Sequence, residues 1–264
     1  MRLRALALAT AVGLALPLAP ATAHAAKVPT YKVSASISTT SPDVGQSVRI
    51  FGKVKGPKAA KKVVLVQRKV GTSAWRTVAK VRTSKQRTYS ASVKVSTVGA
   101  HQLRVIAPKR TKVAKQGISR TRAFTGWRWL DLTAQPGTEV GPHDRKAVTI
   151  AGKTYAKVMT FEGTGIYYNV AGVCSTFTTT IGVQDGTTPS AALLTYAHKT
   201  ADASDDGVET VTEVPADTTP KAVRQSLAGI KAFAFGAGGG LVTAVAPQVR
   251  CTVNRLAPIK LSLG

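Results

Sequence analysis

The chain has 264 residues, of which 37 are Lys or Arg and 12 are Asp or Glu, and its formal net charge is +25 at pH 7. Its two cysteines do not complete a zinc site. The small number of carboxylates argues against an enzyme such as a glycoside hydrolase, which needs a pair of them. The charge is also uneven: residues 26–125 hold 23 basic residues and one acidic residue, Asp43, whereas residues 126–264 hold 12 and 11.

Residues 1–25 have the pattern of a cleaved export signal. Arg2 and Arg4 give a positive start, residues 5–18 are almost wholly apolar, and residues 23–25 (Ala-His-Ala) offer the small side chains that a signal peptidase requires. A membrane anchor is the alternative, but the apolar stretch is short and ends at a cleavage site. We therefore expect a mature chain that is secreted, either released or associated with the cell wall.

The first predicted domain, residues 27–122, alternates apolar and polar residues with a period of two. The alternating segments are residues 31–37, 48–51, 63–68, 77–81, 89–95 and 101–106. Turn residues such as Ser41-Pro42-Asp43 separate them. About seven short strands in a segment of this length predict an antiparallel β-sandwich.

This segment resembles the immunoglobulin-like modules of secreted actinobacterial proteins. The resemblance rests on residues 51–54, 64–68, 74–79, 89–93 and 99–105. It implies a non-catalytic spacer or adhesive unit, without the bridge of antibody domains, because this half of the chain has no cysteine.

Basic residues gather at three places in this domain. They are Lys53, Lys55, Lys58, Lys61 and Lys62 around one turn; Lys80, Arg82, Lys85 and Arg87 around another; and Lys109, Arg110, Lys112 and Lys115 after the last strand. Because almost no carboxylate offsets them, we expect them to bind an anionic polymer through salt-sensitive attraction. No motif or aromatic strip for reading bases is present, so sequence-specific nucleic-acid binding is not expected. Solubility or adaptation to high salt is the alternative explanation.

The second predicted domain, residues 123–264, continues the alternation. Its predicted strands are residues 127–132, 147–155, 165–170, 175–183, 191–197, 230–235, 241–245 and 251–256. They predict a jelly-roll-sized β-sandwich, so that the whole chain is all-β. The glycine-rich run at residues 236–240 predicts a hairpin turn, and the acidic cluster Asp202, Asp205, Asp206 and Glu209 predicts a solvated loop and not an EF-hand.

In this order the segments resemble the NPCBM family of carbohydrate-binding modules, which has a galactose-binding-domain-like fold. The matching stretches are residues 127–132, 152–155, 164–170, 177–185 and 229–235. The chain departs from the family at Phe161, where the family has His, at Gln184, where it has Asp, and over residues 247–253. The resemblance implies a glycan-binding module that has lost several of the family's polar residues.

Two cysteines in an exported protein predict one disulfide, Cys174–Cys251, with two buried thiols as the alternative. Both cysteines stand where the family resembled above has aromatic residues. That resemblance implies a bridge between neighbouring strands.

A sugar site needs an aromatic face and a few fixed polar groups. The aromatic candidates are Trp127, Trp129, Tyr155, Tyr167 and Tyr168, and the polar candidates are Glu162, Asn169 and Asp185. Tyr167 and Tyr168 are adjacent on one strand and point to opposite faces, so at most one of them faces a given ligand. We expect neither a metal nor another cofactor.

The sequence therefore predicts a secreted, non-catalytic protein that binds cell-surface or extracellular glycans and is held to anionic polymer by its basic domain. One alternative is an interaction protein whose second domain has lost sugar binding. Another is an accessory module of a glycoside hydrolase system.

Overall fold

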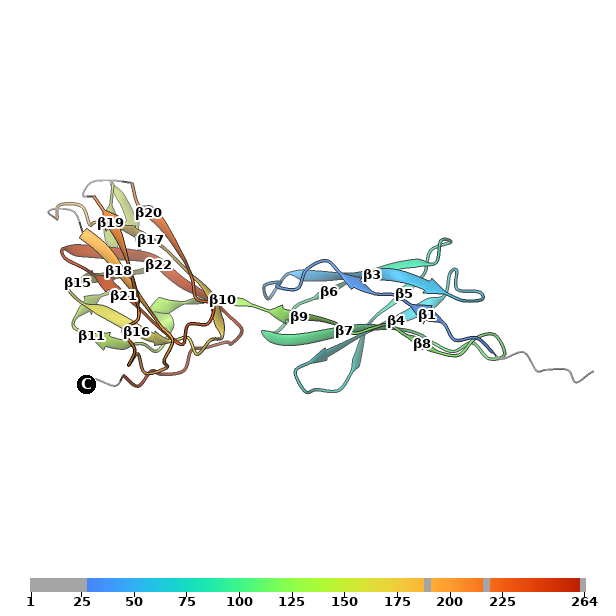
Figure 1. Cartoon of the computed structure of the whole chain (residues 1–264). Helices are drawn as coiled ribbons and strands as arrows, with labels where there is room; N and C mark the ends of the chain where they lie inside the picture. Colours follow the sequence, from blue (N-terminus) through green and yellow to red (C-terminus); the bar gives the residue numbers. More distant parts are fainter. Residues whose placement is uncertain (1–27, 188–190, 216–218, 262–264) are drawn as a thin grey trace, which may run out of the picture.

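The computed structural model describes residues 28–187, 191–215 and 219–261, so the predicted export signal at residues 1–25 lies outside the described residues. Every regular element in these ranges is a β-strand except a short 3-10 turn, η1 (Leu132–Ala134), which confirms the all-β prediction. Figure 1 shows two groups of strands, the N-terminal unit (residues 28–126) and the C-terminal unit (residues 127–261). Within the described ranges, no helix has the length and apolar character needed to cross a membrane.

Two antiparallel sheets form the N-terminal unit. In the first, β3 (Ser47–Lys55) pairs with β1 (Lys32–Val33) and β2 (Ser36–Ile37) on one side and with β6 (Thr88–Lys94) on the other. The second has the order β5 (Arg76–Arg82), β4 (Val63–Val70), β7 (Gly99–Ala107), with β8 (Gly117–Ile118) and β9 (Arg122–Gly126) both against β7. Strand β9 thus extends this sheet past the boundary predicted at residue 122.

Alternation along β3 explains how the two sheets share one core. Val48, Ile50 and Val54 are fully buried, whereas Arg49 and Lys53 are exposed on the other face. The buried side chains of both sheets form a single apolar cluster that includes Tyr89 and Phe124. Burial of these alternating apolar side chains is the main favourable term for folding of the unit.

Two larger antiparallel sheets form the C-terminal unit. One has the order β12 (His143–Asp144), β15 (Val158–Glu162), β22 (Leu241–Cys251), β17 (Cys174–Gly182), β20 (Lys221–Ser226), with β10 (Arg128–Asp131) also against β22. The other has the order β11 (Thr138–Val140), β16 (Gly165–Asn169), β21 (Ala232–Ala237), β18 (Ala191–His198), β19 (Val208–Val214). A separate hairpin joins β13 (Val148–Ile150) to β14 (Lys153–Tyr155).

Three features of the C-terminal unit differ from the sequence predictions. The alternating segment 147–155 is the β13–β14 hairpin and not one strand. Residues 236–240 do not close a hairpin, because β21 and β22 belong to different sheets; Gly239 and Gly240, both with positive φ, let the chain cross from one sheet to the other. Strand β22 ends at Cys251, so residues 252–256 are not a strand.

The predicted disulfide is present. Cys174 and Cys251 lie directly opposite each other on β17 and β22, with their Cα atoms 4.0 Å apart. Both are buried in the core between the two sheets, among aromatic side chains that include Phe177 and Phe233. The bridge therefore joins neighbouring strands, as the family resemblance implied.

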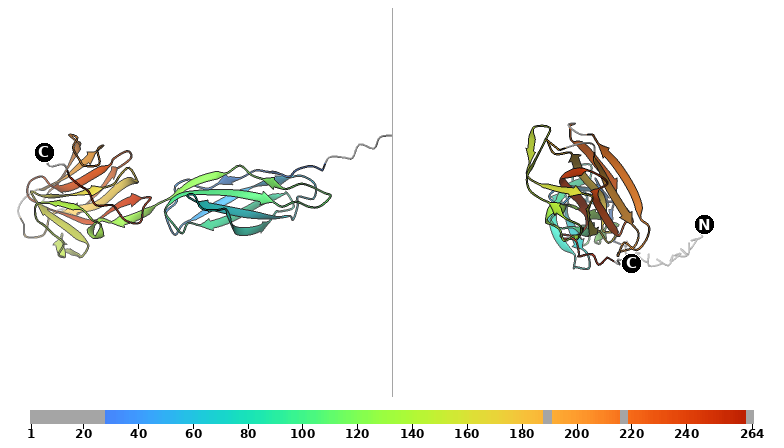
Figure 2. Two further views of the ribbon diagram at one scale, coloured as in Figure 1. Left: turned by 90° about the horizontal axis from the view of Figure 1, so that it is seen from below. Right: turned by 90° about the vertical axis from the view of Figure 1, so that its left-hand side faces the viewer.

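The two units meet around Arg250 of β22. Its Nε atom donates to Asp43 Oδ1 at 2.7 Å, its guanidinium also donates to the carbonyl oxygen of Ser41 at 2.7 Å, and its Cζ atom lies 4.9 Å from the centroid of the Trp127 ring. The backbone N–H of Val44 donates to the carbonyl of Trp127 at 2.7 Å. The left view of Figure 2 shows the resulting end-to-end arrangement.

Candidate anion-binding and glycan-binding surfaces

The basic surface of the N-terminal unit is not neutralised by the carboxylates that the structure describes. Among the described residues, the N-terminal unit takes part in one ion pair, Arg250–Asp43. It contributes the carboxylate of that pair, Asp43, and the C-terminal unit contributes Arg250. The other ion pairs between described residues all lie within the C-terminal unit. No Lys or Arg of residues 28–126 is within 4.0 Å of a described carboxylate, so the described carboxylates of the C-terminal unit form no ion pair with these basic side chains.

The three basic clusters lie close together at one end of the unit. The backbone N–H of Lys61 donates to the carbonyl of Thr83, and the N–H of Thr83 donates to the carbonyl of Lys62, which joins the β3–β4 turn to the end of β5. Arg110, in the loop after β7, is near enough to Lys62 to lower its pKa, although burial contributes more to that shift. In Figure 1 these turns lie at the end of the unit away from the C-terminal unit.

All but one of the predicted polyanion-binding side chains are exposed. The exposed ones are Lys53, Lys55, Lys58, Lys61, Lys80, Arg82, Lys85, Arg87, Lys109, Arg110, Lys112 and Lys115. The exception, Lys62, is half-buried, with its Nζ atom 4.5 Å from the centroid of the Tyr31 ring. A cation that is partly buried over an aromatic ring contributes to packing, so Lys62 is less available to a polymer than its neighbours.

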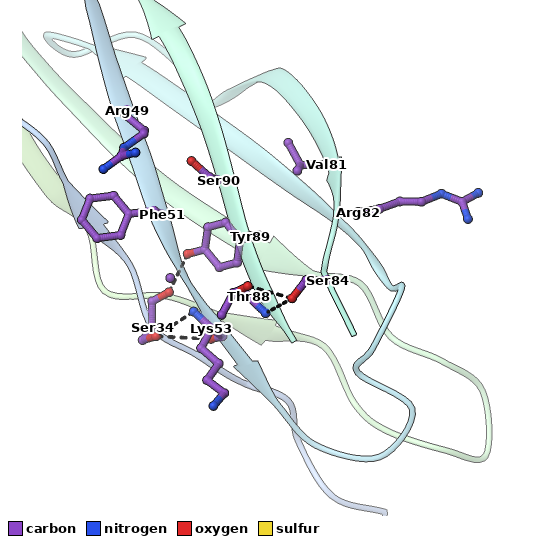
Figure 3. Close-up of a pocket in the computed structure, with 11 residues that line it drawn as sticks. Ser34, Arg49, Phe51, Lys53, Val81, Arg82, Ser84, Thr88, Tyr89 and Ser90 are labelled. Carbon is purple, nitrogen blue, oxygen red and sulfur yellow. Dashed lines mark hydrogen bonds between the residues drawn. The ribbon is translucent and has the colours of Figure 1, made fainter. Parts of the chain in front are cut away.

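A groove of about 650 Å³ opens on the outer surface of β3 and β6 and reaches the edge strand β5 of the other sheet (Figure 3). Arg49 and Lys53 from β3 and Arg82 from β5 supply its cations. Residues with hydroxyl groups also line it, namely Ser34, Ser84, Thr88 and Ser90, together with the buried Tyr89. None of the described residues that line it is a carboxylate. Such a surface suits an anion that also accepts and donates hydrogen bonds.

Hydrogen bonds fix part of this groove. The Tyr89 hydroxyl donates to the carbonyl oxygen of Ser34 at 2.5 Å, and burial raises the pKa of that phenol, with Arg122 opposing the shift. Gly52 lies between them, where a Cβ atom would collide with the Ser34 carbonyl and the Tyr89 hydroxyl. The hydroxyls of Ser84 and Thr88 are 2.7 Å apart. The polar lining is thus held by contacts that do not need a ligand.

The aromatic and polar sugar-binding candidates do not come together. Trp127 packs under Arg250 at the junction of the units, and Trp129 is half-buried on β10. Tyr155 lies on the β13–β14 hairpin, where the Lys153 ammonium is 5.2 Å from its ring centroid. Trp129 is paired with Arg250 on β22, so the two tryptophans lie near each other at the junction of the units, whereas Tyr155 lies apart from them on the hairpin.

The polar candidates have structural partners or separate positions. Asp185 accepts hydrogen bonds from the backbone N–H groups of Ala151 and Gly152 at 2.7 and 2.9 Å, so it holds the β13–β14 turn. The Asn169 side-chain amide donates to the carbonyl of Pro258 at 3.3 Å. Glu162 is exposed and lines a hollow that contains no other predicted sugar-binding residue.

Tyr168 is a core residue, which corrects its place among the ligand-binding candidates. Its side chain is fully buried, its hydroxyl donates to the Leu132 carbonyl at 3.0 Å, and its ring stacks on Phe235. Its neighbour Tyr167 points to the opposite face of β16, as the alternation requires, and is half-buried there.

Tyr167 borders a trough of about 330 Å³ on the outer face of the sheet formed by β11, β16, β21, β18 and β19. Ala234 on the middle strand β21 lies opposite Tyr167 of β16 on one side and Tyr196 of β18 on the other. Gly236, also on β21, lies opposite Leu194 of β18. Small side chains on the middle strand and large ones on its neighbours therefore make a hollow with two tyrosines at its sides.

A carboxylate lies beside the trough. Glu209 of β19 is opposite Tyr196, and a hydrogen bond between the two side chains, helped by burial, raises the pKa of the Tyr196 phenol. Glu209 was predicted to lie in a solvated acidic loop, but it lies on strand β19 and faces this surface. Asp205, from the same predicted cluster, is bound to His198 at 3.1 Å and to the backbone N–H of Lys199 at 2.9 Å.

The residues of these surfaces that the sequence did not indicate include Arg49, Tyr196 and the hydroxyl-bearing residues of the groove. Arg49 lies outside the three clusters of basic residues, and only its position beside Phe51 and Lys53 on β3 brings it to the groove. Tyr196 lies in a segment that was predicted as a strand. Its position across β21 from Tyr167 of β16 could not be predicted without knowing the order of the strands in the sheet.

No protein-family model matches this chain, and no curated protein matches it. The immunoglobulin-like and NPCBM assignments therefore stay predictions from the sequence.

Proposed function

We propose that this chain is a secreted, non-catalytic binding protein whose N-terminal unit holds it to an anionic polymer at or near the cell surface. The observation that supports this most strongly is the absence of any carboxylate partner for the Lys and Arg side chains of described residues 28–126. The one acidic residue of that unit, Asp43, is occupied by Arg250. A surface with one sign of charge repels itself, and a bound polyanion removes that repulsion.

Binding of the full chain to two polymers of similar length tests this proposal. The chain should bind poly(glycerol phosphate) at low salt and should not bind uncharged dextran measurably through the same unit. Isothermal titration calorimetry measures both affinities directly. Absence of binding to the phosphate polymer at 20 mM salt would contradict the proposal.

We further propose that the C-terminal unit binds a glycan, as its NPCBM resemblance implies. The trough between Tyr167 and Tyr196 supports this role, because two aromatic side chains border a floor of small residues. Stacking of an aromatic side chain on the apolar face of a pyranose is the usual basis of sugar binding by such surfaces.

Replacement of both tyrosines should weaken glycan binding. The variant Tyr167→Ala/Tyr196→Ala is expected to lower affinity for a glycan found on an array at least tenfold, since each lost aromatic contact is worth about 1 kcal/mol. Tyr155→Ala, which removes a half-buried tyrosine outside the trough, is the control. If no glycan on the array binds the full chain, the interaction-protein alternative is favoured.

A further inference from the structure

We infer that the groove between β3, β6 and β5 is a binding site for a polyol phosphate chain, an anion of repeating phosphodiesters linked by hydroxyl-bearing units. This inference rests on the proposed function and deepens it, because it names one site and one ligand class within the large basic surface. Arg49, Lys53 and Arg82 would contact phosphates, and the outward-facing hydroxyls of Thr88 and Ser90 would contact the linking units.

The alternation of the strands places cations and hydroxyls side by side on one face. Phe51 and Lys53 of β3 lie opposite Ser90 and Thr88 of β6, and all four side chains are on the outer face of the sheet. A phosphodiester carries one negative charge and accepts hydrogen bonds, so both kinds of neighbour stabilise it.

The positions of the cationic groups favour an extended anion over a single phosphate. In Figure 3 the side chains of Arg49 and Lys53 point in different directions, and that of Arg82 extends away from both. They do not converge on one point, as the ligands of an isolated phosphate must. A chain with several phosphates can reach each cation in turn, and each neutralised phosphate adds to the affinity.

The groove is poorly suited to stacked bases. Among the described lining residues, Phe51 is the one phenylalanine or tryptophan, and the Arg49 guanidinium lies 5.1 Å from its ring centroid, over the face that a base would need. Tyr89, the other aromatic residue there, is buried and its hydroxyl is bonded to Ser34. Proteins that bind single-stranded nucleic acid offer several exposed aromatic faces. The observations therefore favour a polyol phosphate over DNA or RNA.

A pair of matched double variants of the full chain tests the site. Arg49→Gln/Lys53→Gln removes one Arg and one Lys from the groove, and Lys109→Gln/Arg110→Gln removes the same charges from the loop after β7. With poly(glycerol phosphate) as the probe, the groove variant should lower the salt slope of log K by about 1.4, because each phosphate contact to a single chain adds about 0.7. The loop variant should lower it clearly less.

A substitution that removes no charge distinguishes binding at a specific site from general attraction to a charged surface. Ser90→Ala removes a groove hydroxyl, and Ser92→Ala removes the next outward hydroxyl of β6, which does not line the groove. We expect Ser90→Ala to weaken binding about threefold to tenfold, the effect of one hydrogen bond, and Ser92→Ala to leave it unchanged. Circular dichroism confirms that each variant is folded.

The outcomes distinguish this inference from the proposed function. If the wild-type chain binds poly(glycerol phosphate) but the groove and loop variants lose affinity equally, and Ser90→Ala has no effect, the groove is not the site although polymer retention stands. If the wild-type chain does not bind, both fail. Tighter binding to oligodeoxythymidylate with the same number of phosphates, or equal competition by inorganic phosphate, would overturn the choice of ligand.

Discussion

The affinity of the full chain for a phosphate polymer is expected to fall on the order of a thousandfold when salt is raised from 50 to 200 mM. Each Lys or Arg that contacts a phosphate releases a counterion, and a flexible single chain contacting about eight such residues gives this dependence. The three neighbouring basic clusters and Arg49 supply more than that number of exposed cations. Fluorescence anisotropy of a labelled polymer across a salt series measures the slope.

The C-terminal unit supplies the internal control for this result. Its trough is bordered by tyrosines and a carboxylate and contains no cation, so glycan binding there should change little over the same salt range. An affinity for the phosphate polymer that is equal at 50 and 200 mM salt would mean that contacts other than ion pairs hold it. The electrostatic account of the N-terminal unit would then be wrong.

Loss of the disulfide is expected to lower the unfolding free energy of the C-terminal unit by about 4 kcal/mol. Cys174 and Cys251 are 77 residues apart in the chain, and a crosslink over a loop of that length strongly restricts the unfolded state. Both sulfur atoms are buried in the core, so a Cys174→Ala/Cys251→Ala variant also loses packing. Urea unfolding followed by fluorescence of Trp127 and Trp129 measures the change.

The N-terminal unit is the control for this prediction, because it contains no cysteine and has its own apolar core. Its unfolding, followed by the fluorescence of Trp75, should keep the same midpoint in the double alanine variant. A midpoint for the C-terminal unit that also stays unchanged would show that the bridge does not stabilise the fold. Retention on phosphate polymer should not depend on the bridge.

Strand positions were predictable where one face of a strand is buried. Strands β3, β4, β6 and β7 alternate in sequence as they do in burial. Strand β15 was missed because Val158, Met159, Thr160 and Phe161 are all buried, so its sequence does not alternate. Strand β19 was missed for the opposite reason: it is an edge strand whose residues from Val208 to Val211 are all exposed. Period-two alternation identifies strands with one buried face, and it fails for strands that are buried on both faces and for strands that are exposed on both faces.

The candidate sites were less predictable than the strands, because a site depends on which strands are neighbours. The charge imbalance already identified the basic unit, and the structure added Arg49 and the hydroxyl row by pairing β3 with β6. The aromatic candidates were chosen from one family resemblance, and of these only Tyr167 lines the trough. Its partner across the trough, Tyr196, is 29 positions further along the chain, a proximity that no local pattern indicates.

Lysine footprinting of the full chain, with and without poly(glycerol phosphate), tests most directly where the polymer binds. Acetylation rates measured by mass spectrometry should fall severalfold at lysines of the N-terminal unit, above all at Lys53. Rates at Lys153, Lys199 and Lys221, which are exposed on the C-terminal unit, should stay as they are without polymer. Equal protection of lysines in both units, or protection confined to the C-terminal unit, would contradict the account.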